Sequence, residues 1–384
     1  MPPCPGRGLS PCPSGRRSRY RRCQSTPRAP PGSASPPPRD RRQRAPPPAP
    51  RARPAAGWGR SRGPWGRTGR SRTHCGDRVV RGPLGREPAQ GAAAPARIVD
   101  IPRGRTAVIR IVTDSSCDLP DEVIERHRIT IVPLTIRFGD EEFVDREQLT
   151  TDEFWRRLTE GGVLPQTAAP SVGRFQEAFR RLSNEGADGV VVICISSKIS
   201  ATHQAAVLAA EQFVGGVPIR VVDSALVTAA LGLVVIEAAE LAATGVGIDA
   251  VEDAAVAAAA ATNIYATLDT LEFLHRGGRI GGAQAFFGNL LDVKPIISFH
   301  EGAVEAAGRV RTRRKALAAV AAHVAGLGDR IRSFGVIHSD PADLEEFLAA
   351  IRAVRDEEPL IARLGPVVGT HAGPGVAGVV YRLR

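Results

Sequence analysis

The sequence lacks the short motifs that assign many chains to a reaction class. Neither GxSxG nor HExxH occurs, and the glycine-rich segment HRGGRIGG has the spacing of neither a dinucleotide fingerprint nor a phosphate-binding loop. These absences argue against a serine-hydrolase elbow, a zinc-protease helix and nucleotide binding.

Long apolar runs are also absent. No stretch is long enough to span a membrane, and no apolar segment follows a charged start as it does in a secretory signal. We therefore expect no transmembrane segment, and we expect the globular part to be cytoplasmic.

Cysteine is scarce, and its spacing forms no metal-binding pattern. The chain has six cysteines, and the four in residues 1–106 lack the paired spacing of zinc ligands. We expect no metal site and no cofactor, and we expect Cys117 and Cys194 to be reduced thiols.

Residues 1–106, the leader, contain no lysine and few acidic side chains, but they are rich in arginine and proline. They hold 24 Arg against four acidic residues, a net +20, whereas the whole chain carries +11. The other 278 residues are therefore net −9, since 11 minus 20 is −9. High charge without apolar periodicity predicts disorder for the leader.

The composition of the leader permits two interpretations. Its arginine-only basicity is typical of translated GC-rich sequence, so our hypothesis places the natural start of the protein near residue 100. Alternatively, the leader is an arginine-rich tail that binds nucleic acid or membranes nonspecifically. The acidic remainder indicates no specific nucleic acid partner.

From Ala107 onward, short β-branched runs alternate with helical stretches, which is the pattern of an α/β fold. The runs VVVICI and IRVV are apolar throughout, as expected of strands covered on both faces. We predict strands at 107–112, 129–136, 189–195, 218–222 and 262–268. We predict helices after Leu119-Pro120 and at 150–159, 171–183, 201–213, 226–243 and 249–261.

A second unit begins near residue 263 and has an α+β pattern. We predict helices at 283–290, 312–325 and 341–354 and strands at 293–299, 333–338 and 359–363, with a hairpin turn at Glu301-Gly302. The prediction is an N-terminal α/β domain with a mostly parallel sheet at 107–262 and a C-terminal α+β domain at 263–384. Clefts between two domains commonly bind ligands.

The first polar cluster, VTDSSCDLP, directly follows the first predicted strand. Asp114, Ser115 and Ser116 lie at a strand end, which is where open α/β sheets bind ligands. A structural role is the alternative, because Ser116 or Asp118 could cap the next helix with Pro120 in its first turn. The residue types leave both roles open.

Two further clusters supply hydroxyl groups. In QTAAPSVGRF, Ser171 is a candidate N-cap, whereas capping leaves Thr167 unexplained. In ISSKISATHQ, four hydroxyls follow an apolar strand, namely those of Ser196, Ser197, Ser200 and Thr202. One cap needs fewer hydroxyls, and a helix N-terminus attracts anions, so this turn favours carboxylate or phosphate binding.

The C-terminal segment GPVVGTHAGPGVAG is predicted to be a glycine-rich loop around His371. Glycines let a backbone approach a ligand closely, so His371 either contacts an anionic headgroup or has a structural role.

Two basic patches interrupt the acidic body of the chain. They comprise Arg276 with Arg279, and Arg309, Arg311, Arg313, Arg314 and Lys315. The second patch is either a solvated helix face or, with the first, a docking surface for an acidic partner.

Seven segments, taken together and in their order along the chain, resemble the DegV family of bacterial fatty-acid-binding proteins. The resemblance covers about 107–384 and depends on VTDSSCDLP, TAAPS, SSKISATHQAA, VVDSALVTAALGLVV, LEFLHRGGRI, NLLDVKPIIS and GTHAGPG. It implies a two-domain α/β protein that holds one long-chain fatty acid in a buried tunnel between its domains. It also implies a partner, an ATP-dependent fatty acid kinase that converts the acid to an acyl phosphate for phospholipid synthesis.

The resemblance further implies roles for individual residues. It places the fatty-acid carboxylate at Thr167 and Ser200, with His371 nearby, and implies no catalytic residue. The secondary ligand candidates are Ser115, Ser196, Ser197 and Thr202. The candidate kinase contacts are Arg276, Arg279, Arg309 and Arg311.

The chain departs from the family pattern at two positions. Ala168 stands where a serine is common, and Ala201 stands where the family has glycine, so the shape of that turn could differ. The hydroxyls of Thr167 and Ser200 are kept.

Two other functions are the alternatives. A lipid hydrolase or acyltransferase would pair His371 with Ser196, Ser197 or Ser200, although a sequence does not show hydrogen-bond reach. Nucleic acid binding would depend on the leader and disappear when the leader is deleted.

Overall fold

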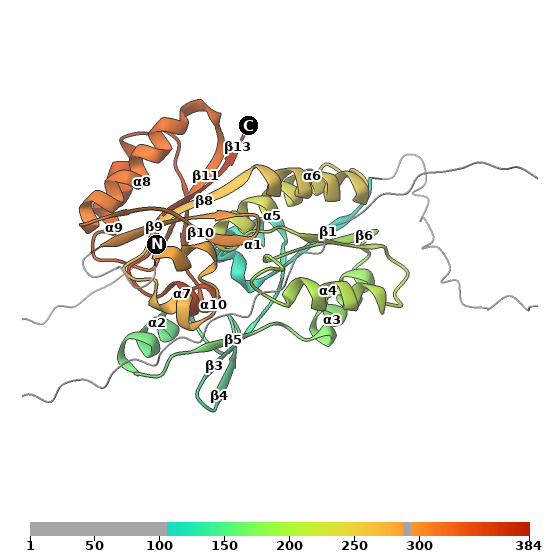
Figure 1. Cartoon of the computed structure of the whole chain (residues 1–384). Coiled ribbons are helices and arrows are strands. Elements are labelled where there is room, and N and C mark those ends of the chain that lie inside the picture. Colours follow the sequence, from blue (N-terminus) through green and yellow to red (C-terminus); the bar gives the residue numbers. More distant parts are fainter. Residues whose placement is uncertain (1–105, 287–292) are drawn as a thin grey trace, which may run out of the picture. The chain divides into compact units, whose positions relative to one another are not determined.

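Three β-sheets organise the described part of the chain, which comprises residues 106–286 and 293–384 of the computed structural model. These residues all belong to one compact unit, drawn in colour in Figure 1. The predictions for the leader up to residue 105 lie outside the described residues. Within the described ranges, no helix combines the length and apolar character needed to cross a membrane.

The first sheet is parallel, and its strands have the order β2-β1-β6-β7. They are β1 (Ile109–Asp114), β2 (Thr130–Val132), β6 (Gly189–Cys194) and β7 (Ile219–Asp223). One face is covered by α3 (Val172–Asn184) and α4 (Thr202–Glu211), the other by α5 (Thr228–Ala243) and α6 (Ile248–Ala261), as Figure 1 shows. Every residue of β6 is therefore buried, which confirms the interpretation of VVVICI.

The second sheet is mixed, with the order β10-β9-β8-β13-β11-β12. Its strands are β8 (Thr262–Thr267), β9 (Lys294–His300), β10 (Ala303–Val310), β11 (Ile331–His338), β12 (Leu360–Arg363) and β13 (Ala377–Leu383). Helices α8 (Arg313–Leu327) and α9 (Leu344–Arg352) cover one face. Together the two larger sheets confirm the predicted α/β fold class.

Helix α5 packs between the two larger sheets. It contacts β1 of the parallel sheet and β8, β11 and β13 of the mixed sheet, and eleven of its sixteen residues are buried. A helix that is apolar all round is expected in such a position. Gly232 permits a close approach, because a Cβ there would lie 2.7 Å from the Leu119 side chain.

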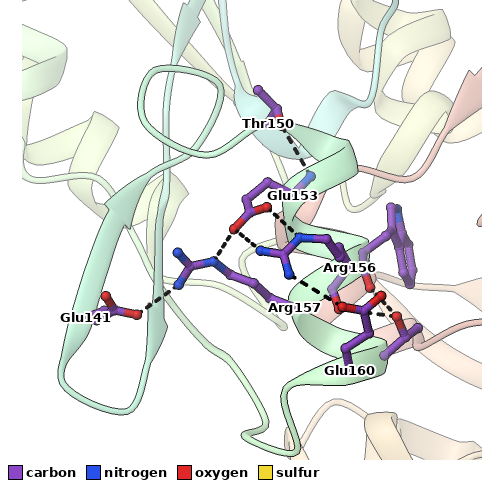
Figure 2. Close-up of polar contacts among 8 residues, drawn as sticks. Glu141, Thr150, Glu153, Arg156, Arg157 and Glu160 are labelled. Atoms are coloured by element: carbon purple, nitrogen blue, oxygen red, sulfur yellow. Dashed lines mark hydrogen bonds and ion pairs between the residues drawn. The ribbon is translucent and has the colours of Figure 1, made fainter.

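The third sheet is small and antiparallel, with the order β4-β3-β5. It comprises β3 (Thr135–Phe138), β4 (Glu141–Val144) and β5 (Gln166–Ala168). Arg157 of α2 (Thr151–Glu160) joins the helix to this sheet by binding Glu141 of β4 at 2.8 Å (Figure 2). Arg157 also binds Glu153 of its own helix at 2.6 Å. Thr150 caps α2 by accepting the N–H of Glu153.

Helix α2 buries Phe154 and Trp155 against α10 (Pro366–Ala372). The two helices approach closely at Gly369, where a Cβ would lie 2.5 Å from the Phe154 ring and 2.9 Å from the Trp155 ring. The indole N–H of Trp155 also donates to the carbonyl of Leu364 at 3.0 Å. These contacts fix the position of α10, which carries His371.

Several local predictions are wrong, each for a physical reason. The strand predicted at 129–136 is divided at Pro133 into β2 and β3, which join different sheets, because proline has no N–H to continue a ladder. Where a helix was predicted at 283–290, Gly281–Phe286 forms 3₁₀ turns, and residues 287–292 lie outside the described ones. The predicted C-terminal loop is α10 followed by β13, since Pro366 suits a first helical turn.

Helix capping differs from the prediction at the first polar cluster. Helix α1 (Asp121–His127) starts after Pro120 with no side-chain cap, so neither Ser116 nor Asp118 caps it. Ser171, in contrast, caps α3 as predicted, by accepting the N–H of Arg174. A short helix, α7 (Glu272–Arg276), ends at the second residue of HRGGRIGG.

Candidate functional site

A largely apolar pocket lies where α5, α10 and the mixed sheet come together. It encloses about 810 Å³ of space free of protein atoms, including the part that is open to solvent. Seventeen lining residues are apolar, namely Leu134, Ile195, Ile199, Val227, Ile264, Ala266, Leu268, Leu274, Ile297, Phe299, Val304, Ile337, Leu364, Val367, Val368, Ala372 and Val376. The five polar ones are Thr167, Ser200, Thr228, Arg279 and His371.

Thr167 and His371 form the central contact among these polar residues. Thr167 lies on β5, opposite Ile136 of β3, and His371 lies in the last turn of α10. Oγ1 of Thr167 is 2.9 Å from Nε2 of His371, although 204 positions separate the two residues in the sequence. The contact of β5 with α10 therefore brings together two residues that the sequence places far apart.

Burial keeps His371 neutral. Its pKa is lowered from 6.5 to about 4, first by burial and second by the positive charge of Arg279. At neutral pH one ring nitrogen therefore carries a proton and the other is an acceptor. Nδ1 is buried and has no hydrogen-bond partner among the described residues, and Gly277 packs against it so closely that a Cβ would lie 2.2 Å away.

Ser200 lies in the turn between β6 and α4. Its Oγ is 2.8 Å from Oγ1 of Thr202 and accepts the N–H of Thr202 at 3.3 Å. Thr202 is fully buried and is not among the residues that line the pocket. Ala201 has φ −79° and ψ 3°, which alanine adopts without strain, so this turn does not require glycine.

Arg279 is held at the pocket by two backbone carbonyls. Its Nε donates to the carbonyl of Ile199, next to Ser200, at 3.0 Å, and its Nη1 donates to the carbonyl of Gly277 at 2.7 Å. Arg279 also lines an outer pocket that shares Thr167 and His371 and includes Arg276. Three of the polar residues of the apolar pocket thus also line an outer pocket, which contains two arginines.

Three other hydroxyl candidates lie outside the pocket lining. Ser115 accepts the N–H of Leu134 at 3.1 Å, and Ser196 donates to the carbonyl of Gly302 at 2.7 Å. Ser197 is exposed. The first two therefore stabilise the protein around the pocket.

The remaining arginine candidates lie on the mixed sheet. Arg309 and Arg311 are exposed at the end of β10 and just after it, and the Arg309 guanidinium lies 5.7 Å from the Phe286 ring centroid. Arg313 of the same predicted patch binds Asp343 at 3.0 and 3.1 Å, which neutralises part of the patch. Arg276 pairs with Glu272 at 2.5 Å.

Asp118 has a role at the pocket that sequence reasoning missed. Its Oδ2 accepts the Thr228 hydroxyl at 2.7 Å, and its Oδ1 accepts the N–H of Gly365 at 2.9 Å. Burial raises its pKa from 3.8 to about 7 against the effect of both hydrogen bonds. Asp118 and Thr228 have φ of 49° and 53°, and for a β-branched threonine this conformation is rare. No sequence signal reveals such a backbone conformation.

We expect Asp118 to make the protein less stable as the pH rises through 7. Its pKa is higher when folded, so its contribution to stability is complete below pH 3.8 and is lost as the pH rises through about 7. The variant Asp118→Asn does not titrate. Its urea unfolding midpoint should therefore change less than that of the wild type between about pH 4.5 and about pH 7.5. Equal changes in the two proteins would contradict this assignment.

The sequence matches known proteins over the whole described region. The family model described as "Uncharacterised protein, DegV family" matches residues 108–384. The DegV domain-containing protein SCO2569 of Streptomyces coelicolor is 40% identical over 284 residues, which cover 72% of this chain and 99% of the relative. The DegV domain-containing protein lmo2514 of Listeria monocytogenes is 35% identical over 280 residues, with 72% and 99% covered.

Solved structures share the fold. A DegV family protein from Thermus thermophilus, described as binding fatty acid, is 34% identical with a TM-score of 0.65, covering 72% of this chain and 99% of its own. DegV from Bacillus subtilis, described as a fatty acid binding protein, is 28% identical with a TM-score of 0.66, covering 73% and 100%. With its parallel-sheet and mixed-sheet domains and its match to the family model, this chain belongs to the DegV family.

Proposed function

We propose that this protein binds a long-chain fatty acid in the apolar pocket and presents the carboxylate to an ATP-dependent fatty acid kinase. The product is an acyl phosphate for phospholipid synthesis, and the chain itself is a carrier with no catalytic residue. The proposed setting is the cytoplasm, where such a kinase has access to ATP. The observation that carries the proposal is a pocket with seventeen apolar lining residues and five polar ones, of which Thr167 and His371 lie 2.9 Å apart.

The apolar lining suits an acyl chain. Burying about fifteen methylenes at about 0.8 kcal/mol each gives on the order of 12 kcal/mol of gross transfer free energy. Ordering the chain and losing its translational freedom remove part of this, but tight binding remains. The fatty acids bound by the Thermus and Bacillus relatives support this ligand class.

The polar group suits a carboxylate. With its proton on Nε2, neutral His371 donates to Thr167, which leaves the Thr167 hydroxyl free to donate to the ligand. Thr202 can donate to Ser200 in the same way, so that Ser200 also directs its proton toward the ligand. Hydrogen bonds to a charged acceptor are stronger than neutral ones, so two hydroxyls hold the carboxylate without a direct ion pair.

This arrangement also suits phosphoryl transfer by a partner. In that reaction a carboxylate oxygen forms a bond to the γ-phosphorus of ATP while the bond to ADP breaks, so the ligand needs no proton removed. Neutral donors leave the oxygens nucleophilic, and electrostatic stabilisation in such transfers commonly comes from arginine, lysine and magnesium. Arg276 and Arg279 in the outer pocket are therefore candidate kinase contacts.

The geometry does not favour the hydrolase alternative. In the part of the chain that the structure describes, His371 binds Thr167, and none of Ser196, Ser197 and Ser200 hydrogen-bonds to it. The low pKa of His371 also makes it a weak general base.

The purified protein is expected to contain close to one fatty acid per chain, since most of the residues that line the pocket are apolar. Denaturing mass spectrometry of the protein and its organic extract measures this directly. Loaded protein should form a hydroxylamine-trapped acyl product with ATP only when the kinase is added. A protein without bound lipid that also takes up neither palmitate nor oleate would overturn the proposal.

A further inference from the structure

The segment Asp114–Asp118 does not line the apolar pocket, yet its side chains bind the pocket wall at several points. Three of its side chains accept hydrogen bonds there, at 2.7 to 3.1 Å. Asp114 accepts the N–H of Ile195, Ser115 that of Leu134, and Asp118 the Thr228 hydroxyl and the N–H of Gly365. Ile195, Leu134 and Thr228 are lining residues, and Gly365 follows another, Leu364.

The two carboxyl groups of this segment are buried, which argues that their contacts with the pocket wall have a role beyond stability. Asp114 is 0% exposed and Asp118 is 5% exposed. Burying a carboxyl group is unfavourable, and apolar side chains of similar size would often fill such a site with equal or greater stability. The carboxyl groups instead fix backbone and hydroxyl groups of distant segments at defined distances.

Asp118 connects two parts of the wall that are far apart in the sequence. Thr228 is the first residue of α5, and Gly365 immediately precedes α10, which carries His371. One carboxyl group therefore sets the position of α5 relative to α10. Thr228 is held in a left-handed conformation by this contact and by the start of α5, and such strained residues are often functional.

We propose that Asp118 is a positioning residue for fatty acid binding, which acts through Thr228 and Gly365 to hold the pocket wall and His371 in register. This inference rests on the proposed function, because it assigns Asp118 to the same pocket. Asp118 itself does not touch the ligand.

Two variants of Thr228 separate this role from packing. Thr228→Val keeps the branched shape and removes the hydroxyl, whereas Thr228→Ser keeps the hydroxyl and removes a methyl group. If the contact to Asp118 positions the wall, the Val variant should bind palmitate about tenfold more weakly than the Ser variant. If only shape matters, the Ser variant should be the weaker binder, and the proposal is overturned.

Two variants of Asp118 provide a second test. Asp118→Ala removes both contacts, whereas Asp118→Asn can accept from Gly365 through its amide oxygen and donate to Thr228 through its amide nitrogen. The Asn variant should recover most of the affinity that the Ala variant loses. In the Ala variant, the His371 ring signals in ¹⁵N-histidine NMR should shift, because α10 is released.

The stability of each variant is measured beside its affinity. Loss of stability with wild-type affinity and unchanged His371 signals would show a purely structural role and overturn the inference. A wild-type protein that binds no fatty acid would instead overturn the proposed function. If Asp118→Ala does not fold, the comparison of Thr228→Val with Thr228→Ser decides.

Discussion

Replacing Thr167 by Val and Ser200 by Ala together is expected to weaken palmitate binding by roughly 100-fold to 10,000-fold. Each hydroxyl is proposed to donate one hydrogen bond to the carboxylate, and such a bond to a charged group contributes about 1.5–3 kcal/mol. The apolar lining is unchanged, so the variant should retain weak, nonspecific affinity for the acyl chain. Displacement of a fluorescent fatty acid by palmitate measures the affinity of the wild type and that of the double variant.

Ser197→Ala provides the matched control for this double variant. Ser197 lies in the same turn as Ser200 but is exposed and outside the pocket lining, so its loss should leave the affinity close to that of the wild type. Palmitate binding by the double variant within about threefold of the wild type would refute the assignment of the two hydroxyls as carboxylate donors.

Replacing Phe154 by Ala is expected to destabilise the protein by about 3–5 kcal/mol. Phe154 is 0% exposed, and its ring centroid lies 5.1 Å from that of Trp155 and 6.1 Å from that of Phe138. It also packs on Gly369, so its loss leaves a cavity under α10. Urea unfolding monitored by circular dichroism measures the change.

Val256→Ala provides the comparison for this large-to-small substitution. Val256 is on α6 and is 52% exposed, so removing its methyl groups should change the free energy of unfolding by less than about 0.5 kcal/mol. Because Phe154 supports the helix that carries His371, the Phe154 variant should also retain less fatty acid during purification. Equal stability of the two variants would contradict the packing described for α2 and α10.

The sequence predicts the parallel sheet well and the small sheet poorly. The run VVVICI identifies β6 because a strand buried on both faces is apolar throughout. Strand β5, in contrast, has three residues, and two of them are exposed. It is a strand only because β3 pairs with it, and this pairing is a tertiary contact that no local pattern records.

The residues proposed to bind the fatty-acid carboxylate could be identified from the ordered motifs, but the distances between them could not be predicted from the sequence. Thr167 and His371 are brought within 2.9 Å by the contact of β5 with α10. Helix α10 is a seven-residue helix with an internal glycine, so its sequence has no clear periodicity. The residues of the pocket wall could not be predicted from the sequence either, because apolar lining residues have the same sequence pattern as core residues. The role of Asp118 depends on Thr228 and Gly365, 110 and 247 positions away.

The position of β13 in the mixed sheet has a consequence for biosynthesis. This strand is the last in the sequence, yet it lies between β8 and β11 in the interior of the sheet. Proteins are made from the N-terminus at a limited rate, and a central strand must be present before its neighbours can pair across it. We therefore expect a nascent chain in which β13 has not yet been made to be unable to retain a fatty acid.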